Sequence, residues 1–152
     1  MKTTIRPATH DDLDLLLDIA EAMHAESPRF SRIAFSEDKV LQLWITLVDS
    51  PNGLLLVAER DSTIIGGIAA FACPHWMSDE LVASDYGVFV LPEHRGGMTA
   101  FRLVNKYVEW AHSKGVKPGW IQLGISTGIL QDETAALYRA IGFKQFSIGL
   151  EV

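Results

Sequence analysis

The sequence contains a single cysteine, Cys73, and its five histidines show no spacing typical of metal ligands. One thiol cannot form a disulfide within the chain, which fits a protein of a reducing compartment. We expect Cys73 to be a small buried hydrophobic residue and not a nucleophile. The sequence therefore predicts neither a disulfide scaffold nor a metal centre.

Long apolar runs are also missing. The first residues, MKTTIRPATHDDLD, become polar and acidic at once, so no secretory signal is expected. The longest apolar stretches, at 64–73 and 85–92, are far shorter than the roughly 20 residues that cross a bilayer. These absences predict a soluble, cytoplasmic protein with no membrane partner.

Basic residues are outnumbered, because 13 lysines and arginines stand against 19 aspartates and glutamates, and the formal net charge is −6. An acidic surface repels phosphate backbones and anionic membranes. It argues against nucleic-acid binding and mildly favours cationic substrates such as amines. The 152 residues and the hydrophobic content of 48% suit one compact domain over 1–152.

Two well-known phosphate-binding motifs are absent as well. No glycine-rich loop closes with Lys followed by Ser or Thr, which excludes the nucleoside triphosphate loop. No G-x-G-x-x-G is followed by an acidic residue about twenty positions later, so a dinucleotide-binding fold is not expected.

Strand and helix patterns follow one another along the whole chain. The predicted strands are at 3–8, 54–59, 64–73, 81–91, 120–126 and 143–151, and the predicted helices are at 13–23, 36–48, 100–112 and 133–141. This order predicts an α/β fold with a mixed, largely antiparallel central sheet flanked by helices. Gly66 and Gly67 predict a bulge or a close backbone approach inside one strand.

The segment VLPEHRGGMTA, at 90–100, lies between a predicted strand and a predicted helix. Gly96 and Gly97 allow a tight turn that brings main-chain amides close to a ligand. The first amides of the next helix lack partners within it, and the helix dipole adds partial positive charge. With Arg95, these features are typical of an anion site that suits a pyrophosphate, although such loops also occur as plain turns.

This stretch resembles the acetyl-CoA signature of the GCN5-related N-acetyltransferases (GNAT), roughly Arg/Gln-x-x-Gly-x-Gly/Ala after a strand that ends in Val-x-Pro. Arg95 matches the first position and Ala100 the last, whereas Met98 stands where the middle glycine is usual. Gly97 supplies a glycine one position earlier. IRPAT near the start and YRAIGF near the end are similar to the family's opening strand and its Tyr-x-x-x-Gly-Phe ending.

The resemblance implies that acetyl-CoA is the co-substrate and that its acetyl group moves to a primary amine of a small molecule or a protein. It also implies that the main chain of Val88 and Val90 pairs with the pantetheine arm. The loop residues expected to hold the pyrophosphate are Arg95, Gly96, Gly97, Met98, Thr99 and Ala100.

The general acid is expected at Tyr138, because the resemblance assigns its position to a tyrosine that donates a proton to the coenzyme sulfur. A phenol has a pKa of about 10 and is protonated at neutral pH. The general base stays open between two nearby acids, Asp85 and Glu80. Tyr86 and Ser84 are the alternative, as residues that order a water molecule.

Asp85 has the wrong parity to share a face with Val88 and Val90 on a flat strand. A bulge, which the resemblance leads us to expect in this strand, corrects the parity. In the preceding loop, His75 and Trp76 are candidates to border the acceptor pocket, although an exposed and a packed loop residue are the simpler interpretations.

The acceptor remains open. Arg29 and Arg32 lie in a loop that often covers the acceptor site in this family, and they are either a site for an anionic acceptor or a solvated loop. The alternative to an enzyme is a catalytically weak acyl-CoA-binding module with a sensing or assembly role. The resemblance also makes a homodimer plausible, with Trp120 and Phe146 suited either to its interface or to the core.

Overall fold

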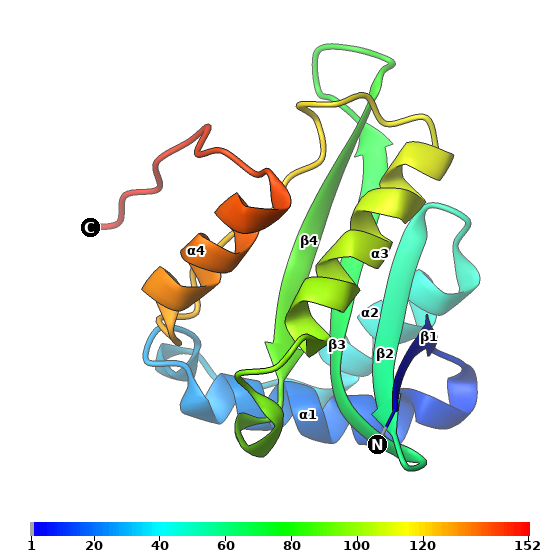
Figure 1. The fold of residues 1–152 in the computed structure, drawn as a ribbon, viewed down its shortest axis with the longest axis vertical. Helices are drawn as coiled ribbons and strands as arrows, with labels where there is room; N and C mark the ends of the chain where they lie inside the picture. Colours follow the sequence, from blue (N-terminus) through cyan, green and yellow to red (C-terminus); the bar gives the residue numbers. More distant parts are fainter. Residues whose placement is uncertain (1) are drawn as a thin grey trace.

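The computed structural model of the chain describes residues 2–152. A four-stranded sheet with the order β1-β2-β3-β4 forms its centre, and every neighbouring pair is antiparallel (Figure 1). The strands are β1 (Thr3–Pro7), β2 (Gly53–Arg60), β3 (Thr63–Pro74) and β4 (Leu81–Val90). The sequence predicts all four to within a few residues.

Gly66 and Gly67 lie where the backbones of neighbouring strands approach β3 closely. A Cβ atom on Gly66 would come within 2.6 Å of the carbonyl oxygen of Phe89, and one on Gly67 within 2.7 Å of that of Leu56. The register between β2 and β3 also shifts directly beside Gly66. The predicted bulge and close approach are therefore both confirmed.

Helices cover both faces of this sheet (Figure 1). α1 (Leu13–Glu26) and α2 (Glu37–Asp49) pack on one face, and α3 (Thr99–Ser113) packs on the other. The alternation of β2 explains this, since Leu55 and Val57 point to α1 and α2 while Leu56 and Ala58 point to α3. Within residues 2–152, none of the helices is both long and apolar enough to cross a membrane.

The predicted strand at 120–126 forms a single bridge with the sheet. Ala83 pairs in parallel with Ile121, through bonds of 2.9 Å from Ala83 N to Trp120 O and from Gln122 N to Ala83 O. Beyond Gln122 the segment separates from β4, and side chains take up its main-chain groups. The prediction of a strand over 120–126 was therefore wrong. The bridge to Ile121 is nevertheless parallel, whereas all the pairs within the sheet are antiparallel.

The last helix, α4 (Gln131–Ile141), lies beside the β4 edge of the sheet, and the C-terminal residues lead away from it (Figure 1). The predicted strand at 143–151 is not formed. Phe146, Ile148 and Leu150 are exposed, and no described segment pairs with this part of the chain. The residues do alternate as in a strand, but a strand also needs a neighbour to bond with, and no described part of the chain provides one.

Candidate functional site

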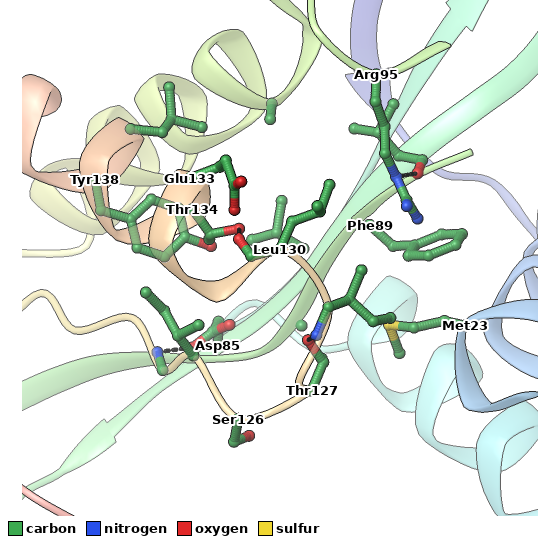
Figure 2. A pocket seen from close by; sticks show the side chains of 18 of the residues that line it. Met23, Asp85, Phe89, Arg95, Ser126, Thr127, Leu130, Glu133, Thr134 and Tyr138 are labelled. Atoms are coloured by element: carbon green, nitrogen blue, oxygen red, sulfur yellow. Dashed lines mark hydrogen bonds between the residues drawn. The ribbon is translucent and has the colours of Figure 1, made fainter. Parts of the chain in front are cut away.

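A cavity of about 340 Å³ opens beside the free edge of β4 (Figure 2). Its walls are the second half of β4, the segment 124–130, the first turns of α4 and the loop 95–97, with Met23 and Phe30 added from α1 and the turn after it. The polar residues that line it are Asp85, Tyr86, Arg95, Ser126, Thr127, Glu133, Thr134 and Tyr138. An apolar cavity with a few polar groups is typical of a small-molecule site.

Asp85 lies in this cavity because β4 carries a bulge. Ala69 and Ala70 are adjacent on β3, yet they pair with Gly87 and Asp85. Tyr86 is therefore an extra residue with no partner on β3, which is the defining feature of a bulge. The bulge expected in this strand is confirmed.

The bulge also decides which side chains share a face. It brings Asp85 onto the same face of the sheet as Val88, because the extra residue changes the alternation by one position. Tyr86 lies on the opposite face, where its ring is 5.0 Å from that of Phe71. The bulge therefore gives Asp85 the parity that a flat strand would not give it, and Tyr86 lines the cavity as well.

The carboxyl group of Asp85 is half-buried and has one main-chain donor from the neighbouring segment, since Gly124 N donates to Oδ1 at 2.8 Å. No cation of residues 2–152 forms an ion pair with it. Burial raises the pKa of Asp85 to about 6, and the bond from Gly124 partly opposes this rise. A carboxylate that binds its proton near pH 6 can act as a base at neutral pH.

Tyr138 lies on the same side of the cavity as Asp85 (Figure 2). Its side chain is 6% exposed, its ring is 6.0 Å from that of Phe143, and its hydroxyl forms no hydrogen bond with any described residue. Burial raises the pKa of Tyr138 above the ordinary value of 10, and the negative charge of Asp85 raises it further. The phenol is therefore protonated at neutral pH and free to donate.

The loop before α3 presents a row of unused amides. The first bond into the helix runs from Arg102 N to Met98 O, and the amides from Gly96 to Phe101 donate to no described residue. Gly96 has φ +87°, a conformation that favours glycine, whereas Met98 has φ −93° and an exposed side chain. Position 98 therefore has a backbone conformation that methionine adopts without strain, and the loop does not need a glycine there.

Arg95 does not offer the free charge that its position suggested. Its guanidinium forms a bidentate ion pair with Glu26 at the end of α1, with distances of 2.6 and 2.8 Å. Its Nε donates to Val90 O at 2.8 Å, and its Cζ lies 5.1 Å from the ring centre of Phe89. Arg95 thus fixes the loop to β4 and α1, and Glu26 balances its charge.

The main-chain groups of β4 at Val88 and Val90 point towards the cavity. Leu91 N donates to Ile65 O on β3, so the groups of the preceding residue, Val90, point away from β3. Alternation gives Val88 the same direction. Val90 O already accepts the bond from Arg95, which leaves Val90 N and both main-chain groups of Val88 without a partner among the described residues.

Several residues considered from the sequence lie outside the cavity. Glu80 pairs with Lys117, away from the cavity at the start of β4. His75 and Trp76 are in the loop between β3 and β4, where Trp76 is 86% exposed, and they do not line the cavity. Cys73 is exposed near the end of β3, so the expectation of a buried thiol was wrong.

The segment after α1 is bonded to the segment 124–130, which forms one wall of the cavity. Ser27 is fully buried, and its hydroxyl donates to Thr127 O at 2.5 Å. Arg29 and Arg32 both form ion pairs with Glu151. Their charges are therefore engaged within the chain, which agrees with the simpler of the two interpretations of this loop.

Sequence reasoning missed Glu26, Glu133 and the amide of Gly124. Glu133 follows the predicted loop and could have been found as an acidic residue in the first turn of a helix. The partnership of Glu26 with Arg95 spans 69 positions, and no local pattern marks it. A main-chain donor such as Gly124 N leaves no trace in a sequence.

A family model described as "Acetyltransferase (GNAT) family" matches residues 17–143. A comparison with curated protein sequences finds no significant match.

Many solved structures share the fold. One is the aminoglycoside acetyltransferase AAC(6')-Iy in complex with the bisubstrate analogue CoA-S-monomethyl-acetylneamine (17% identity, 100% of this chain and 97% of that chain, TM-score 0.79). Another is a predicted acetyltransferase from Clostridium acetobutylicum with acetyl-CoA (18%, 99% and 96%, 0.77). A third is a transcriptional regulator from Bacillus halodurans C-125 (23%, 99% and 99%, 0.78). At these identities the likeness concerns the fold.

Proposed function

Because the chain belongs to the acetyltransferase (GNAT) family, we propose that it transfers the acetyl group of acetyl-CoA to a primary amine, with Asp85 as general base and Tyr138 as general acid. One observation carries this proposal: a carboxyl group with a raised pKa and a protonated phenol line one cavity, next to a strand edge and a row of free amides.

In the proposed reaction, Asp85 first takes a proton from the ammonium form of the acceptor. The neutral nitrogen attacks the thioester carbonyl carbon, the carbon–sulfur bond breaks, and Tyr138 donates its proton to the departing sulfur. The second proton of the nitrogen passes through water to the Tyr138 phenolate and restores the phenol, and Asp85 releases the first proton to solvent. The products are an amide and a free thiol.

The donor would be held mainly by main-chain groups. The free amides from Gly96 to Ala100 suit the pyrophosphate, and the N–H and C=O of Val88 suit the amide groups of the pantetheine arm. Arg95 shapes the loop, and the helix terminus supplies most of the attraction for the phosphates.

We propose a small cationic amine as the acceptor. Asp85 and Glu133 line the cavity without an ion pair to any described residue, and the charge of Arg95 is balanced, so the cavity carries negative charge. Solved structures with this fold include aminoglycoside acetyltransferases in complex with a bisubstrate analogue of acetylneamine and with sisomicin, which supports the proposal without fixing the compound.

The test is a release assay for free thiol, with acetyl-CoA and a panel of amines. We expect turnover with cationic amines, and a fall in kcat of about 100-fold in Tyr138→Phe with little change in donor affinity. Calorimetry with acetyl-CoA controls for binding. Donor binding without turnover, unchanged by Tyr138→Phe, would show the alternative of an acyl-CoA-binding module to be correct.

We further propose that residues 1–152 form one acetyltransferase domain, that the protein is cytoplasmic, and that it pairs as a homodimer. Trp120 and Phe146, which are 42% and 68% exposed, support the dimer. Light scattering after size exclusion should give twice the mass of the chain, and Phe146→Glu should return it to a single chain. A monomer at all concentrations would contradict the dimer.

A further inference from the structure

Tyr107, in α3, has a fully buried side chain whose hydroxyl has one specific partner. Its ring packs in the core between α3 and the sheet, and its OH donates to Gln122 O at 2.6 Å. A buried phenol needs such a partner, because an unbonded hydroxyl in the core is costly. The acceptor, Gln122, is the last residue of the 120–126 segment that bonds to the main chain of β4.

The bond to Tyr107 takes the place of the next rung of a parallel ladder. Ala83 already donates to Trp120 O and accepts from Gln122 N. If the pairing continued, Asp85 N would donate to Gln122 O, and Gly124 N would donate to Asp85 O. Instead, Gln122 O accepts from the phenol.

The following rung is replaced in the same way. Gly124 N donates to the side-chain Oδ1 of Asp85 at 2.8 Å, and not to its main-chain oxygen. Two side chains therefore stand where two main-chain bonds would otherwise extend the sheet. The cavity opens at this fork, between β4 and the segment that begins at Gly124.

We propose that Tyr107 is a positioning residue for Asp85: by occupying Gln122 O it stops the pairing after Ala83 and aims Gly124 N at the Asp85 carboxylate. Without the hydroxyl, Gln122 O is free to accept Asp85 N, and Gly124 N is drawn to the main-chain oxygen. The carboxylate then loses its donor from the segment. This inference rests on the proposed function only in giving Asp85 a role in catalysis.

The titratable groups around Asp85 are few. Tyr107 faces it from α3 and Tyr138 from α4. Burial raises the pKa of both phenols, and the charge of Asp85 raises it further. Glu133 and Arg95 line the same cavity. The residue opposite on β3 is Ala70, and the 120–126 segment contains no titratable side chain, so a change at Tyr107 can be read cleanly at Asp85.

The experiment is a carbon-13 NMR titration of the Asp85 carboxyl in the full chain. In Tyr107→Phe we expect its pKa to rise by about one unit, the size of effect that one lost bond to a charged group gives. The acidic limb of the activity profile should move by the same amount. Val104→Ala is the matched control, because Val104 is also fully buried in α3 but forms no bond to the segment, and its titration should not move.

A folded Tyr107→Phe protein with an unshifted Asp85 titration would overturn the proposal. If that variant does not fold, Tyr107→4-fluorophenylalanine fills the space of the hydroxyl without donating, and the pKa of Asp85 must then rise by about one unit in that protein. Tyr107→4-aminophenylalanine keeps a donor and must restore the original pKa. The titration needs no turnover, so an inactive protein would contradict the proposed function while leaving this test intact.

Discussion

Two carboxylates, Asp85 in the wall of the cavity and Glu26 as the ion-pair partner of Arg95, have opposite electrostatic surroundings. Arg95 and Asp85 lie at opposite ends of the cavity (Figure 2). Glu26 faces a guanidinium in a bidentate pair, and this pairing lowers its pKa below the ordinary value. Asp85 has no cation and one donor from the neighbouring segment, and burial raises its pKa to about 6. The same functional group is thus kept charged at one end and made easy to protonate at the other.

The difference assigns two roles: Glu26 carries a structural charge, which holds the loop, and Asp85 carries a chemical charge, which can exchange a proton. A carboxylate that stays ionised at every physiological pH can hold a loop but cannot exchange a proton there. A carboxylate whose pKa approaches neutrality can do so, and such groups gather at functional sites. The end of the cavity with Asp85 and Tyr138 is therefore where we expect bonds to change, and the end with Arg95 is where we expect the donor to be anchored.

The largest effect should come from removing the chemical charge. Asp85→Asn keeps an oxygen for Gly124 N but cannot accept a proton, so we expect kcat to fall between about 100-fold and 1,000-fold. Asp85→Glu retains a titratable group and should recover part of the rate. Steady-state kinetics across pH measures both rates. Full activity in Asp85→Asn would mean that another residue acts as the general base.

Removing the structural charge should act on stability. Glu26→Gln leaves the partly buried Arg95 guanidinium without its counter-charge, and we expect a loss of about 1–2 kcal/mol in the free energy of unfolding at pH 7. Because the pKa of Glu26 is lowered by folding, its contribution is present at neutral pH and is lost as the pH falls through the folded value.

Glu133→Gln provides the control for this measurement, because Glu133 lines the same cavity but forms no ion pair with a described residue. Denaturant unfolding of Glu133→Gln should give a change below about 0.5 kcal/mol. Equal losses of unfolding free energy in the two variants would mean that the Glu26–Arg95 ion pair adds no stability of its own.

At Asp85 the sign of the stability effect should be reversed. Folding raises its pKa from 3.8 to about 6, so the folded state favours the neutral carboxyl and loses stability as the pH rises through this window. Asp85→Asn removes the buried charge and should stabilise the protein by about 1–2 kcal/mol at pH 7, with the gain disappearing towards pH 4. This gain is smaller than the full pKa difference implies, because water in the open cavity screens the charge of Asp85.

The sequence was a good guide to the elements and a poor guide to pairing over distance. The four strands of the sheet and the four long helices follow from local periodicity. The resemblance to the family, and not periodicity, pointed to Tyr138, which lines the cavity. The failures were the strands at 120–126 and 143–151. Both segments have strand-like alternation, but one is bonded by Tyr107 and Asp85 in place of a full ladder, and the other has no neighbour.

The contrast between Glu26 and Asp85 could not be predicted from the sequence either. Asp85 was named as a candidate base, yet its orientation depends on a bulge that the residues alone did not reveal. Arg95 was expected to offer a free charge to a phosphate, and only the fold brings Glu26 to it from α1. Distant partners determine both pKa values, and distance along the chain removes them from any local pattern.

The smallest effect, and the one that most directly separates the two carboxylates, is their response to salt. At 1 M salt the screening length is about 3 Å, against about 8 Å at physiological ionic strength, so the Glu26–Arg95 pair should weaken. The stability loss in Glu26→Gln should shrink by several tenths of a kcal/mol. The gain in Asp85→Asn should change less, because desolvation, and not an opposing charge, causes it. Equal salt responses in the two variants would mean that ion pairing governs both ends of the cavity.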